Sequence, residues 1–188
     1  MYNRVLSSLE KQRINSYLAI RYGITLDQTV ATNYIASDGT TVLWDATANS
    51  AYKNDITVIG RDDKGTINQK QSKSVNTTGL IAIALGNTVQ STNSANSNTF
   101  SADKVFAAFG SNADPISWTN TSPPVGRQAL EREWKIQETG TIGSVRVQVP
   151  DDGSAITTKL PAETGGTVYL LMDADGDFSS GATSTTMS

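Results

Sequence analysis

The apolar positions at the start of the chain recur with the period of a helix. Ser7 and Glu10 form the S-x-x-E pattern of a capping box, in which each side chain satisfies a backbone N–H of the first turn. Gly23 stands where a left-handed residue ends a helix. These signals predict one amphipathic helix over residues 6–22. Its apolar stripe consists of Leu6, Leu9, Ile14, Tyr17, Leu18 and Tyr22.

The chain after this helix shows the pattern of β-strands. Seven short runs are rich in β-branched or aromatic residues, and they are bounded by Gly, Asn, Asp or Pro. They cover residues 41–44, 55–59, 80–85, 105–110, 132–137, 144–149 and 167–172. The Asn/Ser/Thr run at 90–98 and the Pro-containing stretch at 118–126 are expected to be loops.

Two of these runs alternate strictly between apolar and polar residues. Trp134 and Ile136 form the apolar side of the first run, and Val145, Val147 and Val149 form that of the second. Because only a short Gly-containing segment separates the runs, we expect them to pair as an antiparallel hairpin. The apolar side of each strand is expected to face the core.

Several short strands without a βαβ pattern indicate a mainly β protein. We therefore predict an antiparallel two-sheet sandwich, Ig-like or jelly-roll-like, with one N-terminal α-helix. The 188 residues, of which 37% are hydrophobic, suffice for a sizeable core.

The composition restricts the chemistry that such a fold could carry. Thr, Ser and Asn supply 57 of the 188 residues, whereas Cys and His are absent. Without Cys there is no disulfide, zinc–thiolate site or cysteine nucleophile. Without His there is no Ser-His-Asp triad, and no imidazole is present to act as a base or as a metal ligand. Carboxylate chemistry, hard-cation binding or a role without catalysis remain.

Charge and hydropathy argue against nucleic acid and membrane insertion. The 15 Lys and Arg against 18 Asp and Glu give a net charge of −3, without a basic stripe. No apolar run approaches the ~20 residues of a membrane span, and the first residues lack a signal-peptide pattern. A Thr/Ser/Asn-rich, Lys-poor surface is typical of secreted β-modules. We therefore expect a piece of a longer exported protein, located extracellularly or at the cell surface.

Two N-terminal stretches, YNRVLSSLE at 2–10 and NSYLAIRYGITL at 15–26, resemble a junction in large surface proteins of Bacteroidota. In those proteins a LamG-like (concanavalin-type) jelly roll ends there and an uncharacterised β-rich module follows. The similarity continues through residues 59–63, 68–74, 132–140 and 169–178. Such proteins are often exported by the type IX system and are adhesin-like.

The resemblance implies a domain division. Residues 1–26 would be the tail strand of a preceding LamG-like domain plus a connecting helix, whose apolar stripe would bridge the two domains. Residues 27–188 would form the β-sandwich module. Residues 179–188 offer no evident closing strand for that sandwich.

The strongest candidate site is a triplet of aspartates, Asp173, Asp175 and Asp177. Three carboxylates at every second position can converge on one hard cation if the chain turns, and Gly176 allows that turn. The sequence thus suggests a Ca²⁺ site. It is not an EF-hand loop, because Phe178 stands where that loop needs Gly. The alternative is a solvated turn whose Asp side chains cap backbone N–H groups.

Other acidic pairs favour structural roles. Asp62 and Asp63 follow Arg61, which favours a salt-bridged turn over a metal site. The run 151–153 has the pattern of a turn after a strand, which is favoured over a role as a source of metal ligands. Glu131 and Glu133 have the spacing of a glycosidase pair, yet neighbouring cations favour a solvated charged face.

The three tryptophans divide into two groups. Trp44 and Trp134 stand in β-patterned runs and are expected to be buried. Trp118 stands in a polar, Pro-containing stretch, so it is the candidate for an exposed, sugar-stacking side chain.

Together these features predict a non-enzymatic structural or adhesion module of a multidomain extracellular or cell-surface protein, stiffened by Ca²⁺. Its partners would be neighbouring domains of the same polypeptide and cell-surface glycans or proteins. Self-association through exposed strand edges is an option without support from particular residues. A carbohydrate-binding module is the alternative, and a glycoside hydrolase-type enzyme is a remote one.

Overall fold

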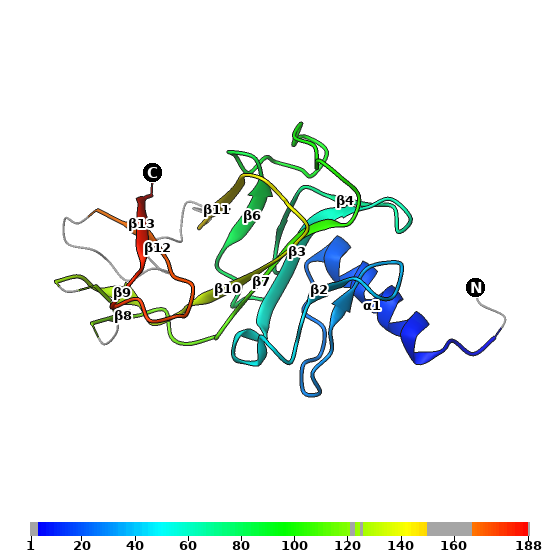
Figure 1. Cartoon of the computed structure of the whole chain (residues 1–188), viewed down its shortest axis with the longest axis horizontal. Coiled ribbons are helices and arrows are strands. Elements are labelled where there is room, and N and C mark those ends of the chain that lie inside the picture. The colour runs from blue at the N-terminus through cyan, green and yellow to red at the C-terminus, as the bar shows by residue number, and fades with distance from the viewer. Residues whose placement is uncertain (1–3, 121–122, 125, 150–166, 188) are drawn as a thin grey trace. The chain divides into compact units, whose positions relative to one another are not determined.

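The structure is a computed structural model and describes residues 4–120, 123–124, 126–149 and 167–187. It confirms a mainly β fold with several antiparallel sheets and one helix near the N-terminus (Figure 1). Contacts divide the chain into two units. The first unit comprises Met1–Ala113 and Trp134–Pro150, and the second comprises Asp114–Glu133 and Asp151–Ser188.

Helix α1 spans Ser8–Tyr22, and its predicted capping box is confirmed. Glu10 N donates to Ser7 Oγ (3.3 Å), and Ser7 N donates to Glu10 Oε2 (2.9 Å). Gly23 ends the helix with a φ of 65°. The Arg4 guanidinium pairs with the Glu10 carboxylate and lowers the pKa of Glu10 to about 2. No helix in the described part of the chain is long and apolar enough to cross a membrane.

The first sheet has the strand order β10-β7-β3-β4, and its neighbouring strands are antiparallel. Its strands are β3 (Asn54–Asp62), β4 (Ile67–Gln69), β7 (Val105–Ser111) and β10 (Trp134–Thr139). The central strands β3 and β7 are buried along nearly their full length. Burial on both faces explains why their sequences contain short continuous apolar runs.

The second sheet has the order β11-β6-β5 and packs against one face of the first. Its strands are β5 (Gln71–Lys73), β6 (Ala82–Leu85) and β11 (Val145–Gln148). A hydrogen bond of 2.6 Å between the hydroxyls of Thr57 and Ser72 links β3 to β5. The two sheets form the sandwich that the sequence predicts.

Helix α1 and a small β1–β2 sheet cover the opposite face of the first sheet (Figure 1). Strands β1 and β2 span Tyr34–Ile35 and Val42–Trp44, and the 3₁₀ helix η1 (Ser50–Tyr52) follows. The main cluster of this layer comprises Ala19, Ile20, Tyr34, Ala36, Leu43, Trp44, Ala46, Ile56, Val58, Ile67, Phe106 and Ala108. The helix, expected as a connector, therefore contributes directly to the core of the first unit.

In the second unit the structure describes two small antiparallel sheets. One pairs β8 (Trp118–Thr119) with β9 (Ala129–Leu130), and the other pairs β12 (Tyr169–Met172) with β13 (Thr183–Thr186). Strand β13 thus lies in the segment where the sequence suggested no closing strand. Its four residues are exposed Thr and Ser, so no apolar alternation marks it.

The expected hairpin between the runs at 132–137 and 144–149 was wrong. Strand β10 pairs with β7 in the first sheet, whereas β11 pairs with β6 in the second. Gly140 and Gly143, with φ of 69° and 81°, let the connection pass from one sheet to the other. Alternation in a strand does not identify the neighbouring strand.

The side chains of β10 also depart from the prediction. Ile136, expected in the core, is 48% exposed, and Trp134 is only half-buried. A polar residue of the strand instead makes contacts with the rest of the unit. Gln137 Oε1 accepts hydrogen bonds from Asp45 N (2.8 Å) and Asn49 Nδ2 (2.7 Å). β10 is an edge strand, and its polar residues tie it to the loop after β2.

Candidate functional site

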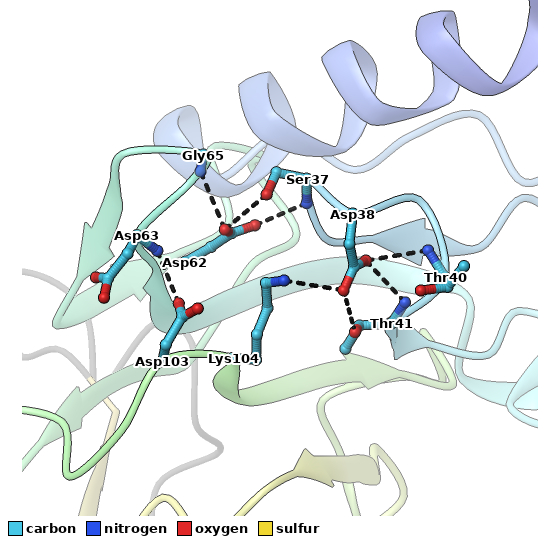
Figure 2. A network of polar contacts seen from close by, with 9 residues as sticks. All are labelled: Ser37, Asp38, Thr40, Thr41, Asp62, Asp63, Gly65, Asp103 and Lys104. Carbon is cyan, nitrogen blue, oxygen red and sulfur yellow. Dashed lines mark hydrogen bonds and ion pairs between the residues drawn. The ribbon is translucent and has the colours of Figure 1, made fainter.

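A group of carboxylates surrounds the turn between β3 and β4 in the first unit, and Asp62 is its buried member (Figure 2). Its carboxylate accepts hydrogen bonds from Ser37 N and Ser37 Oγ, both at 2.7 Å, and from Gly65 N at 3.0 Å. Burial by itself raises the pKa of Asp62, but these hydrogen bonds and the nearby Lys104 outweigh it and lower the pKa. Asp62 is thus an anion held by backbone and hydroxyl donors.

Asp38 and Lys104 form an ion pair beside Asp62 (Figure 2). Lys104 Nζ lies 2.9 Å from Asp38 Oδ2, which also accepts from Thr41 Oγ1 at 2.7 Å. Asp38 Oδ1 accepts from the backbone N–H groups of Thr40 and Thr41, both at 3.0 Å. The ammonium first, and then the Thr donors, hold the pKa of Asp38 far below its usual range.

The backbone of Lys104 is held in an unusual conformation. Its φ of 58° lies in the left-handed region, which costs a non-glycine residue about 1–2 kcal/mol. Lys104 is held by a hydrogen bond of 3.0 Å from its backbone N to Arg61 O and by its ion pair with Asp38. Together they tie the start of β7 to the end of β3 and to the β1–β2 loop.

Acidification should destabilise the first unit through Asp38. Because the folded-state pKa of Asp38 is lowered, its carboxylate contributes stability that is fully present above about pH 4 and is lost as the pH falls toward the folded value. Lys104→Gln removes the depressing cation, so the stability of this variant should fall less steeply between about pH 4 and about pH 2. Urea unfolding at several pH values measures the slopes, with Lys53→Gln as the matched control. Equal slopes for the two variants would contradict this assignment.

The exposed carboxylate of this group, Asp63, confirms the predicted salt-bridged turn. Asp63 accepts from Arg61 Nε (2.7 Å) and from a terminal guanidinium nitrogen (2.8 Å). Asp63 N donates to Asp103 Oδ1 at 2.8 Å (Figure 2). Asp62 is the buried last residue of β3, whereas Asp63 is exposed in the turn that follows, so these neighbouring acids have different environments.

A groove of about 490 Å³ lies between α1 and the β3–β4 turn, and we name it the α1 groove. Ser37, Asp62 and Gly65 contribute to its wall, so the buried carboxylate network holds one side of it. Apolar side chains that line it are Leu6, Ile14, Tyr17, Leu18, Ile35 and Ile67. This groove combines residues from distant segments of the chain, so no local sequence pattern indicates it.

The three aspartates of the predicted Ca²⁺ site lie on the turn after β12. Asp173 Oδ1 accepts from the N–H groups of Asp175 and Gly176, both at 2.8 Å. Asp175 Oδ1 accepts from Asp177 N (2.9 Å), and Asp177 Oδ1 accepts from Ser179 N (3.1 Å). This is the capping arrangement that the sequence left as the alternative.

The side chain of Asp175 first, and then the backbone N–H groups of Asp175 and Gly176, lower the pKa of Asp173. Among the described residues no group of three or more carboxylates is arranged to hold a metal ion. Ca²⁺ binding at the triplet therefore stays a prediction from the sequence.

The other candidate residues lie apart from the β3–β4 turn in the chain. Trp118 is half-buried on β8, opposite Leu130 of β9, and its role in ligand binding stays a prediction. Glu131 accepts from Ser117 Oγ at 2.9 Å. Trp44 is fully buried, as expected. Residues 151–153 lie outside the described residues.

Sequence reasoning missed Asp38, Asp103 and Lys104. Asp38 stands in a Ser-Asp-Gly-Thr turn, where an Asp commonly caps the following N–H groups. Its role in the turn could therefore have been predicted from the sequence. Asp38 and Lys104 are 66 residues apart, so no local sequence pattern indicates that they pair.

Comparison of the chain with curated proteins and with solved structures gives no match. One family model matches residues 10–188, from the first turn of α1 to the C-terminal residue of the sequence. The matched range includes both units and the whole β3–β4 carboxylate group. The chain therefore belongs to the family described as a domain of unknown function (DUF8202).

Proposed function

We propose that this chain is a non-enzymatic structural or adhesion module of a multidomain extracellular or cell-surface protein. The observation that carries the proposal is the use of its carboxylates. Asp38, Asp62 and Asp173 each accept two or more hydrogen bonds from groups in turns. An acid engaged in this way stabilises a turn and is a poor proton donor, because its pKa is lowered.

The polar loops support the same role. Asn96 is fully buried, and its Nδ2 donates to Leu85 O (3.0 Å) while its Oδ1 accepts from Asn98 N (3.0 Å). Asn93 Oδ1 accepts from Lys70 N (2.6 Å). The Asn/Ser/Thr run is thus pinned to the second sheet through short side chains. A β-sandwich with pinned loops can transmit load between domains or present a fixed surface without Cys cross-links.

Removing residues 10–188 from the parent polypeptide is expected to reduce attachment of the producing cells to a surface under flow. Antibody labelling of intact cells should detect the parent polypeptide outside the cell, before and after the deletion. Unchanged attachment of cells that still display the shortened polypeptide would contradict the proposed structural or adhesion role.

A glycan array with the purified chain separates this proposal from the carbohydrate-binding alternative. Glycan binding that Trp118→Ala abolishes, with the fold retained, would assign the chain to that alternative class.

A further inference from the structure

The α1 groove has an uncovered apolar lining. Leu18 is 41% exposed although it lies one turn from Ile14 on the same side of the helix. The face of α1 that packs on the sheet is formed instead by Ser16, Ala19 and Ile20. Helix α1 therefore has one apolar side in the core and a second one directed at solvent, and exposed apolar surface of this kind marks interaction sites.

Two positively charged side chains that lack a partner acid in the described part of the chain lie beside this lining. Arg13 and Lys64 line the groove, and neither belongs to an ion pair among the described residues. The acidic groups that reach the groove are already engaged, since Glu10 pairs with Arg4 and Asp62 is buried. On a chain with a net charge of −3, this groove is a local site for a partner with apolar and acidic groups.

The same chain carries a segment with those properties. The turn after β12 bears Asp173, Asp175 and Asp177, and residues 169–186 contain no Lys or Arg. Met172, which precedes the turn, is 48% exposed. The hydrogen bonds that the following N–H groups donate to each aspartate fix the turn before it meets a partner, which lowers the entropy lost on binding.

We propose that the chain self-associates by docking the β12–β13 turn of one copy, Met172 with its three aspartates, into the α1 groove of another. Met172 contacts the apolar lining at Ile14 and Leu18. The aspartates pair with Arg13 and Lys64. The two surfaces differ, so the contact is heterologous: repeated from copy to copy, it builds chains or closes into a ring. This inference does not depend on the adhesion role.

Two charge-reversed variants test the contact by complementation. The groove variant carries Arg13→Glu and Lys64→Glu, and the turn variant carries Asp175→Lys and Asp177→Lys. Sedimentation of the full chain in metal-free buffer measures self-association over a range of concentrations. Lys53→Glu with Lys73→Glu is the matched control, because both lysines are exposed and lie outside the α1 groove. Circular dichroism confirms that each variant is folded.

Each reversed variant alone is expected to self-associate at least about tenfold more weakly than the unmodified chain, since like charges meet at the contact. An equimolar mixture of the two variants should associate again, because each groove then meets a turn of opposite charge. Raising the salt concentration from about 0.05 M to about 0.5 M should weaken association of the unmodified chain. The matched control should behave like the unmodified chain.

Three results would overturn the proposal. The unmodified chain could remain monomeric at every concentration, in which case the groove does not bind a second copy. The groove variant could associate as strongly as the matched control. Folded variants that fail to associate when mixed would show that the groove and the turn do not meet. None of these results bears on cell attachment, so failure here leaves the adhesion proposal to its own test.

Discussion

Replacing Asp62 by alanine is expected to lower the free energy of unfolding by about 2–4 kcal/mol. The carboxylate is fully buried and accepts three hydrogen bonds, two from Ser37 and one from Gly65. Alanine leaves these donors without their acceptor at the partly buried wall of the α1 groove, and a donor left unsatisfied away from bulk water costs more than the net gain of the bond itself. The loss should also loosen the wall of the α1 groove, which Ser37 and Gly65 help to form.

Urea unfolding of Asp62→Ala measures this effect, and Asp63→Ala is its matched control. Asp63 is the next residue, but its carboxylate is exposed and pairs with Arg61 at the surface, where such a pair contributes at most about 1 kcal/mol. If the two variants lose equal stability, the buried network does not anchor the turn. Asp62→Asn is a second variant, which keeps one acceptor oxygen and should fall between the two.

Gly60→Ala is expected to cost about 3 kcal/mol or more, as overpacking of a closed core does. A Cβ at Gly60 would lie 2.1 Å from Phe106 Cδ1 and 2.6 Å from Val105 O. Gly60 and Phe106 are paired across the β3–β7 ladder, and the Phe106 ring is fully buried. The ring therefore cannot swing into solvent, and the main chain of β7 would have to move.

Gly143→Ala is the control for the Gly60 substitution. Gly143 has a φ of 81° but open space around a Cβ, so alanine there should cost only backbone strain of about 1–2 kcal/mol. Adding Phe106→Leu to Gly60→Ala should recover part of the lost stability, although Leu alone destabilises the core. Thermal unfolding of the four variants tests this coupling. Additive effects of Gly60→Ala and Phe106→Leu would rule out the steric explanation.

Helix α1 could be predicted nearly to the residue because its signals are local. Ser7 and Glu10 interact within one turn, and Gly23 ends the helix through its own backbone conformation. The seven strands expected from β-branched and aromatic runs all have counterparts, with shifts of up to two residues at most boundaries. Strand β3 is longer than expected, because Arg61 and Asp62 continue it despite their charge.

The strands outside the expected runs are β1, β4, β5, β8, β9 and β13, all of them short, and three of them are polar. Strands β4, β5 and β13 contain mostly Asn, Gln, Lys, Ser and Thr, so they lack the apolar run or alternation that marks a strand. Each exists because a neighbouring strand offers hydrogen-bonding groups, as β3 does for β4. A partner that is distant in sequence leaves no trace in a local pattern.

The candidate site could likewise be predicted only where its contacts join residues that are close in the chain. The sequence located the acidic turns and identified the ion pair of Arg61 with Asp63, since both residues are neighbours in the chain. It could not show that Asp62 would be buried, because that depends on Ser37 from the β1–β2 loop.

The sequence by itself determined a mainly β chain with one capped helix and no His or Cys chemistry, because composition, helical period and caps are local properties. The tertiary structure decided the rest. It paired β10 with β7 instead of β11, buried Asp62 beneath α1, and joined Lys104 to Asp38 across 66 residues. These outcomes depend on which surfaces meet when the sheets and the helix pack, and packing between distant segments is not encoded in any single stretch of the chain.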